Sequence, residues 1–187
     1  MAADPHRAIL RRQLGQRADT LYALYDAASD RSLLDELRRD GIAHDCLFGG
    51  VKATTLADVA PYLIACRQFA GGIDSFLDKV WGRGVSMLID SAAAPEQLRM
   101  QLKKNAFVKN SAGAECYFRY YDARAFSRFV RAATNEQLGQ LCGSAVRAIV
   151  WQDSFSQGLA SMAHKPSGLV KRILAPDTAD FEITPLS

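Results

Sequence analysis

The stretch that decides the fold is LYALYDAASDRSLLDEL, residues 21–37. It begins with apolar and aromatic residues and then Asp26, a composition typical of a buried strand that ends on the aspartate. Ser29 or Asp30 can cap the helix that follows, whose leucines recur at helical spacing until Gly41, the residue type expected just after a helix. The stretch therefore predicts a strand, an aspartate and an amphipathic helix in this order.

The order of strand, aspartate and helix occurs three times along the chain. The strands are predicted at residues 21–26, 85–90 and 117–122, and they end on Asp26, Asp90 and Asp122. Each aspartate can accept hydrogen bonds from the free N–H groups at the start of the next helix, where the helix dipole favours negative charge. Three such units predict an α/β fold, a β-sheet with flanking helices in a single compact domain.

A β-hairpin is predicted within residues 105–121, so the sheet is expected to be mixed rather than purely parallel. Because side chains alternate along a strand, two faces are expected: Cys116, Phe118 and Tyr120 on one, and Tyr117, Arg119 and Tyr121 on the other. The first face is assigned to the core. The second is a Tyr–Arg–Tyr row, which can pack beneath a helix with Arg119 paired to a carboxylate, or can stack on bases.

Length and composition predict one globular domain with a short segment at each end. The chain has 187 residues, of which 49% are hydrophobic and 23% charged, which is enough to bury a sizeable core. Residues 1–19 are expected to form a lead-in helix, and residues 20–153 the α/β domain. Residues 154–187 show weaker patterning and are predicted to be a C-terminal extension, partly helical or mobile.

The sequence gives no signal for a membrane or for export. No apolar run approaches the roughly 20 residues that cross a bilayer, and the arginine-rich start lacks the apolar core of a signal peptide. The four cysteines, at positions 46, 66, 116 and 142, contain no C-x-x-C pair. We therefore expect reduced thiols and a cytoplasmic location.

Positive charge is concentrated in one region. Residues 96–131 contain eight Lys or Arg and three Asp or Glu, a local net charge of +5 against +3 for the whole chain. The helix predicted after Asp122 places Arg124, Arg128 and Arg131 on the face opposite its apolar residues. These arginines are the predicted partner-binding residues, because they can steer an acidic segment of another protein.

The sequence contains no G-x-S-x-G, no glycine-rich phosphate loop and no H-E-x-x-H, so no catalytic residue, cofactor or metal is predicted. A metal- or thiol-dependent hydrolase, the enzymatic alternative, requires Asp26, Asp90 and Asp122 to converge, or Cys116 to meet a histidine. The simpler interpretation is that each aspartate caps a helix and that Cys116 belongs to the core. A single-strand nucleic-acid binder that uses the tyrosines is the other alternative, although we expect no nucleic-acid partner.

Six blocks, in order along residues 20–153, resemble the DUF4123 domain. They are LYALYDAASDRSLLDEL, LFGG, PYLIAC, VWGRGVSMLIDSAAAPEQLRMQL, the segment from Gly113 to Arg124, and AIVWQD. The most specific are the pair Trp81–Gly82 and the run FRYYDAR. That run departs mildly from the family pattern F-R-F-Y-D-P-R, with Tyr120 for the Phe and Ala123 for the Pro.

The resemblance implies an adaptor, or chaperone, of the bacterial type VI secretion system. Such a protein binds a cognate effector in the producing cell and assists its loading onto the VgrG spike, and it is not an enzyme. The family-marking residues are expected to be structural: Trp81, Gly82, Phe118, Arg119, Tyr121 and Asp122. We expect non-covalent capture of an effector segment by a groove or an exposed sheet edge.

Overall fold

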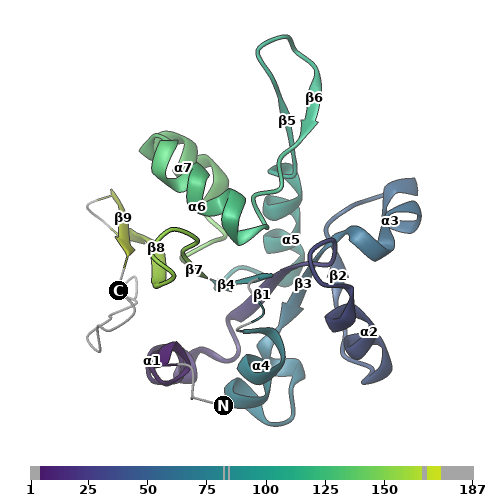
Figure 1. Ribbon diagram of the computed structural model, residues 1–187, viewed down its shortest axis with the longest axis vertical. Helices are drawn as coiled ribbons and strands as arrows, with labels where there is room; N and C mark the ends of the chain where they lie inside the picture. Colours follow the sequence, from purple (N-terminus) through teal and green to yellow (C-terminus); the bar gives the residue numbers. More distant parts are fainter. Residues whose placement is uncertain (1–4, 82, 84, 166–167, 174–187) are drawn as a thin grey trace.

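A seven-stranded β-sheet forms the centre of the molecule, in the order β2-β3-β1-β4-β7-β8-β9 (Figure 1). The computed structural model describes residues 5–81, 83, 85–165 and 168–173. The strands of the sheet are β1 (Leu21–Asp26), β2 (Asp45–Cys46), β3 (Pro61–Ala65), β4 (Ser86–Asp90), β7 (Ala148–Gln152), β8 (Leu159–Lys165) and β9 (Gly168–Ile173). The α/β class and the single compact domain are thus confirmed.

All the described strand pairings are antiparallel, so the expected mixture of parallel and antiparallel neighbours does not occur among them. Strand β1 lies between β3 and β4 and pairs antiparallel with both. Strands β3 and β4 therefore run in the same direction, but they are not paired with each other, so no parallel pair arises. Register then fixes where the strand ends lie. Leu21 is opposite Asp90, and Tyr25 is opposite Ser86, so Asp26 and Asp90 lie at opposite ends of these two paired strands.

Seven α-helices are described around the sheet. They are α1 (Pro5–Leu14), α2 (Arg31–Arg39), α3 (Val51–Thr55), α4 (Gly72–Val80), α5 (Pro95–Lys104), α6 (Ala123–Ala132) and α7 (Asn135–Cys142), with short 3-10 turns at Gly15–Arg17, Ala57–Val59 and Cys66–Gln68. Figure 1 shows α5, α6 and α7 on one side of the sheet, α1 and α4 on the other, and α2 and α3 beyond the β2 and β3 end. The sheet is therefore enclosed between two layers of helices.

The core lies where α6 packs on the sheet. Phe126 of α6 meets Trp151 of β7 edge to face, with ring centroids 4.9 Å apart, and both rings are fully buried. The indole Nε1 donates a hydrogen bond to the hydroxyl of Ser127 (3.1 Å), which also accepts from the amide of Ser154. A buried indole N–H needs such a partner, so Ser127 fixes the register of α6 on β7.

Helix starts follow the predicted capping chemistry only in part. Asp30 caps α2 by accepting from the amide of Ser32, and Asp122 caps α6. Asp26 and Asp90 cap no helix, because several residues separate them from α2 and α5. Their carboxylates accept other hydrogen bonds, described below.

The segment from Asp153 to Ile173 forms strands where a partly helical extension was predicted. Residues 166–167 and 174–187 of the predicted extension lie outside the described residues. Strands β8 and β9 form a hairpin that adds to the β7 side of the sheet, and Leu159, Ala160 and Met162 are buried. The small residues of β8 carry little strand signal of their own. Pairing with the buried strand β7 supplies the stabilisation instead.

The predicted hairpin is present, but it forms a separate two-stranded sheet of β5 (Phe107–Lys109) and β6 (Glu115–Tyr117). The strand predicted at residues 117–122 is therefore wrong beyond Tyr117, because the chain turns there. Tyr120 and Tyr121 are both buried, so the alternation expected for a strand fails. The hydroxyl of Tyr120 donates to the carbonyl of Leu102 (2.7 Å), which draws this turn beneath α5.

Within the described part of the chain, no helix combines the length and apolar character needed to cross a membrane.

Replacement of Met162 by alanine tests whether β8 belongs to the core. Met162 is buried between neighbouring strands, so Met162→Ala should lower the free energy of unfolding by about 2–4 kcal/mol. The matched control is Met100→Ala on the exposed side of α5, which should cost less than about 1 kcal/mol. Urea unfolding measures both, and equally small changes would contradict a core position for β8.

Candidate functional site

A polar hollow of about 510 Å³ lies at the end of β1. Its lining residues are Ala28, Ser29, Arg83, Val85, Arg119 and Arg124. Three of these are arginines that come from separate places: the turn after α4, the turn before α6 and the first turn of α6. We call this feature the arginine hollow.

Asp26 anchors the arginine hollow from below. Its fully buried carboxylate accepts hydrogen bonds from Arg119 Nη2 (2.5 Å), from the hydroxyl of Ser29 (2.6 Å) and from the amide of Ala28 (3.2 Å). A carboxylate removed from water needs a charged partner and additional donors, and Asp26 has both. The Arg119 side chain remains 44% exposed, so this residue neutralises Asp26 and still faces the hollow.

Asp122 holds the second arginine. Its carboxylate accepts from the amides of Arg124 and Ala125 as the cap of α6, and from the Arg124 guanidinium through Nη2 (2.9 Å) and Nε (3.2 Å). Burial alone raises the pKa of Asp122, but these hydrogen bonds and the Arg124 charge hold it below the ordinary value. The carboxylate is thus charged at neutral pH and orients Arg124.

Arg83 is the third arginine, and the sequence analysis did not single it out. It donates to Asp30 (3.1 Å), to Ser32 (3.1 Å) and to Glu36 (2.9 Å), and so ties the turn after α4 to α2. The one feature of the sequence that could have indicated Arg83 is its position directly after the family-marking pair Trp81–Gly82. Its partners on α2 are distant in sequence, so local patterning could not identify them.

The arginine hollow has the chemistry of a carboxylate-binding surface. In the contacts described, Arg119 uses only Nη2, and Arg124 uses Nε and Nη2. The remaining N–H groups of each planar guanidinium are donors available for an incoming anion. Carboxylate is the group that guanidinium recognises in paired hydrogen bonds, and the internal ion pairs hold the arginines in place beforehand.

The other family-marking residues support this region from within. Trp81 and Tyr121 are buried, and Phe118 packs edge to face on Phe129 of α6, with centroids 4.8 Å apart. Burial and the nearby Asp26 carboxylate raise the pKa of Tyr121 to about 12. Gly82 lies outside the described residues.

The structure separates the three arginines predicted to bind a partner. Arg124 lines the hollow, whereas Arg128 is exposed on α6 and has no ion pair among the described contacts. Arg131 donates to the buried carboxylate of Asp153 (2.7 Å) and lies over the ring of Phe155. Arg131 thus has a structural contact that the helical pattern alone did not reveal, and partner binding by the three stays a prediction.

The convergence of Asp26, Asp90 and Asp122 that the hydrolase alternative requires is not formed. Asp90 lies at the other end of the paired strands from Asp26. Its carboxylate accepts hydrogen bonds from Arg17 (2.8 Å), Arg147 (2.5 Å) and Thr20 (2.7 Å). In the residues that the structure describes, no group of three His, Cys, Asp or Glu side chains is placed to hold a metal ion. The buried thiols are poor nucleophiles, since burial raises the pKa of Cys66 to about 11.

The tyrosine row needed for base stacking is not formed either. Tyr121 is buried and Arg119 is bound to Asp26, so only Tyr117 of the expected row has an exposed ring. The assignment of Cys116 to the core is wrong: the residue is half-buried in the hairpin, where its thiol donates to the carbonyl of Ala114 (3.7 Å).

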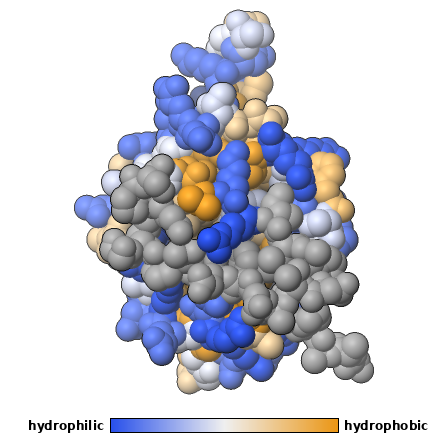
Figure 2. All heavy atoms as spheres, turned by 90° about the vertical axis from the view of Figure 1, so that its left-hand side faces the viewer, coloured by the Kyte–Doolittle hydropathy of each residue, from blue (hydrophilic) through white to orange (hydrophobic). Residues whose placement is uncertain are grey.

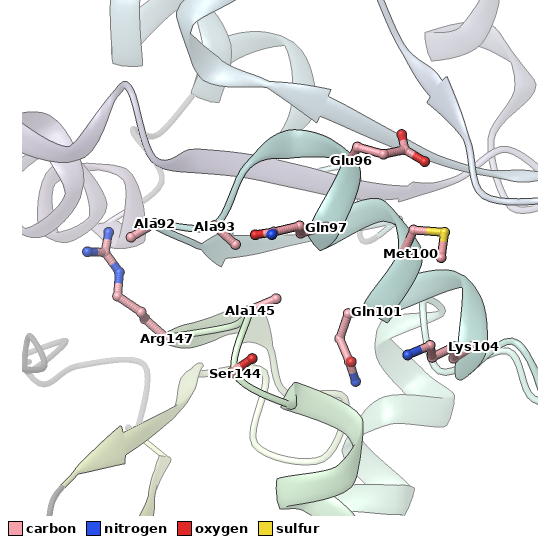
Figure 3. A pocket seen from close by; sticks show the side chains of 10 residues that line it. All are labelled: Ala92, Ala93, Glu96, Gln97, Met100, Gln101, Lys104, Ser144, Ala145 and Arg147. Atoms are coloured by element: carbon pink, nitrogen blue, oxygen red, sulfur yellow. The ribbon is translucent and has the colours of Figure 1, made fainter.

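A second hollow, of about 670 Å³, lies between α5 and the segment that leads into β7 (Figure 3). Alanines and Met100 provide its apolar surface, and Lys104 and Arg147 lie at opposite ends of it. Arg147 is already bound to Asp90. This hollow contains none of the arginines of the first one, so the two are separate surfaces.

Arg119→Ala should destabilise the fold, because it removes the charged partner of the buried Asp26 carboxylate. We expect a loss of about 2 kcal/mol in the free energy of unfolding, partly recovered by Arg119→Lys. Arg124→Ala is the control, since its ion pair is 69% exposed on the arginine side and should contribute less than about 1 kcal/mol. Urea titration at neutral pH measures the three variants, and an unchanged Arg119→Ala would overturn the anchoring role of this pair.

Asp122 should contribute to acid unfolding. A carboxylate whose pKa is lowered in the folded state stabilises the protein above its unfolded pKa of about 4, and this stabilisation is lost as the pH falls through the folded pKa. Asp122→Asn keeps a capping side chain but does not titrate. Its free energy of unfolding should therefore fall less steeply below about pH 5 than that of the unmodified protein. Parallel curves in urea titrations at several pH values would contradict this.

Comparison with known proteins bears on the same region. No curated protein and no solved structure matches the chain. A family model described as "Domain of unknown function (DUF4123)" matches residues 21–140, which include Asp26 and all three arginines of the hollow. Because this match covers more than half of the sequence, the chain belongs to the DUF4123 family.

Proposed function

We propose that the protein is a non-catalytic adaptor of a type VI secretion system, which binds a cognate effector and assists its loading onto the VgrG spike. The proposal joins membership of DUF4123 to what the sequence resemblance implies of that family. The observation that carries it is the arginine hollow, where Arg83, Arg119 and Arg124 come from the two blocks that most specifically mark the family.

Capture in this hollow is physical rather than covalent. Acidic side chains of an effector segment would accept hydrogen bonds from the unused guanidinium N–H groups. Asp26, Asp122 and Asp30 already orient the three arginines, so little side-chain entropy is lost when the segment binds. The same carboxylates limit the net positive charge of the hollow, which keeps the affinity moderate and the complex releasable.

Exposed Arg128 on α6 adds charge beside the site without a described internal partner. A charge of this kind raises the rate of association with an acidic segment more than it raises affinity. We place this encounter in the cytoplasm of the producing cell, before the effector reaches the spike. The two roles proposed for the arginines then differ: Arg124 contacts the bound segment, and Arg128 steers it.

Reversal of one charge in the hollow should weaken capture. The test co-expresses the tagged chain with the products of the genes adjacent to its own and measures co-purification and dissociation constants. Arg124→Glu should bind at least about tenfold more weakly, because it places a carboxylate where one must dock. Arg128→Glu, on the same helix but outside the hollow, should mainly lower the association rate and the sensitivity to salt.

Two results would contradict this function. If no adjacent gene product binds the unmodified chain, the adaptor role is lost. If one binds and Arg124→Glu binds it equally well at low salt, the adaptor role survives but the arginine hollow is not the contact.

A further inference from the structure

The β5–β6 hairpin stands clear of the body in both Figure 1 and Figure 2. Its turn is well built: Asn110 Oδ1 accepts from the amides of Ala112 and Ala114, and Gly113 supplies the positive φ of 80° that the turn requires. The two strands pair only with each other in the described sheet topology. The hairpin is therefore a formed projection, held to the body at its base.

The base of the hairpin is an aromatic cluster covered by a lysine. Phe107 and Tyr117 are cross-strand partners with centroids 5.0 Å apart, and Phe48 packs on both. Lys52 of α3 lies over the two hairpin rings, at 4.2 Å from Phe107 and 5.2 Å from Tyr117. These cation–π contacts fix α3 against one face of the hairpin.

A cleft of about 380 Å³ lies between this face and α3. We call it the hairpin cleft, and its lining residues are Gly49, Val51, Lys52, Lys103, Phe107 and Glu115. Val51, which lines the cleft, is 77% exposed, and Tyr117, which adjoins it as the cross-strand neighbour of Phe107, is 52% exposed. The cleft therefore has exposed apolar surface at its rim and the ring of Phe107 in its lining. Exposed apolar surface that adjoins a hollow is typical of a docking site for another chain.

The charge around the hairpin cleft is positive. Lys109 shares a hairpin face with Phe107, and with Lys52 and Lys103 it makes three cations against one anion, Glu115, which is 3.6 Å from Lys52. Lys103 and Lys109 have no ion-pair partner among the described residues. Lys103 lies across Gly49, where an added Cβ would overlap the ammonium, so the glycine leaves room for this lysine at the cleft wall.

We infer that the hairpin cleft docks an acidic segment of a partner protein. An apolar side chain of the segment packs against Val51 and Tyr117, and acidic residues beside it pair with Lys103 and Lys109. Charge complementarity selects the acidic partner, and the apolar rim favours a protein segment over a purely anionic polymer. The partner's being a protein accords with the proposed adaptor function, but the cleft shares no lining residue with the arginine hollow.

The test uses NMR titration of the full chain, labelled with nitrogen-15, against a short synthetic peptide with glutamates around a central phenylalanine. A counterpart with lysines in place of the glutamates is the control ligand. The acidic peptide should shift the amide signals of Val51, Lys103 and Tyr117, and the lysine peptide should not. Lys103→Glu should weaken binding of the acidic peptide at least about tenfold.

Two variants provide matched controls. Lys104→Glu carries the same charge reversal on the adjacent residue of α5, but Lys104 lines the other hollow (Figure 3), so binding should be unchanged. Val108→Ser alters the exposed residue on the opposite face of the hairpin, and it too should bind normally. Equal losses in Lys103→Glu and Lys104→Glu would indicate a general charge effect and would overturn the site.

The inference also fails if the acidic peptide leaves the cleft amides unshifted, or if the lysine peptide binds equally well. Stronger shifts of the same amides with single-stranded RNA, or with phosphatidylserine vesicles, would overturn the assignment of a protein partner. The outcome is separate from that of the adaptor role. A chain that binds the acidic peptide in the cleft but captures no adjacent gene product keeps this site and loses the proposed function.

Discussion

The ion pair between Asp26 and Arg119 joins the end of β1 to the turn before α6, 93 residues later in the chain. A fully buried carboxylate is stable only with a charged partner and further donors, so the fold must bring Arg119 to this place. That requirement positions the turn from Phe118 to Asp122, the start of α6 and the arginines that face the hollow. The same principle recurs in neighbouring strands. Asp90 at the end of β4 is held by Arg17 and Arg147, and Asp153 after β7 is held by Arg131.

These ion pairs connect the ends of the strands to neighbouring helices and turns. They also determine which charged groups are exposed at the strand ends. The antiparallel register places Asp26 and Asp90 at opposite ends of their paired strands, so these two buried carboxylates do not combine into one acidic centre. At each of these strand ends, the more exposed partner of the ion pair is a guanidinium, and the buried partner is a carboxylate. A protein built in this way presents hydrogen-bond donors at these positions, which accords with the proposed capture of acidic segments.

The parts of the fold that could be predicted from sequence are those whose signal is local. Strands β1 and β4 were evident because each is a continuous apolar run, and α2 because its leucines recur at helical spacing. Strand β8 was missed because alanine and serine make up much of it, and its burial depends on β7. Tyr121 was misplaced because the strand ends at Tyr117 and both Tyr120 and Tyr121 are buried in the turn that follows. The burial of Tyr120 was expected, but it occurs in this turn, where the hydroxyl donates to the carbonyl of Leu102, and not on a strand face. For the candidate site, the pairing of Arg119 with a carboxylate was foreseen, whereas Arg83 depends on α2, which is distant in sequence.

The separation between Asp26 and Arg119 also bears on how the protein is made. Strand β1 is among the first elements synthesised, yet one of its neighbours, β4, and the guanidinium that covers its last residue are made much later. Contacts between distant residues slow folding, because loop entropy is lost before the contact forms. A nascent chain that ends before Arg119 carries an apolar strand with an uncompensated carboxylate at its tip. We expect this arrangement to delay burial of the strand until the arginine has been synthesised, so that the domain folds late, as one unit, rather than strand by strand.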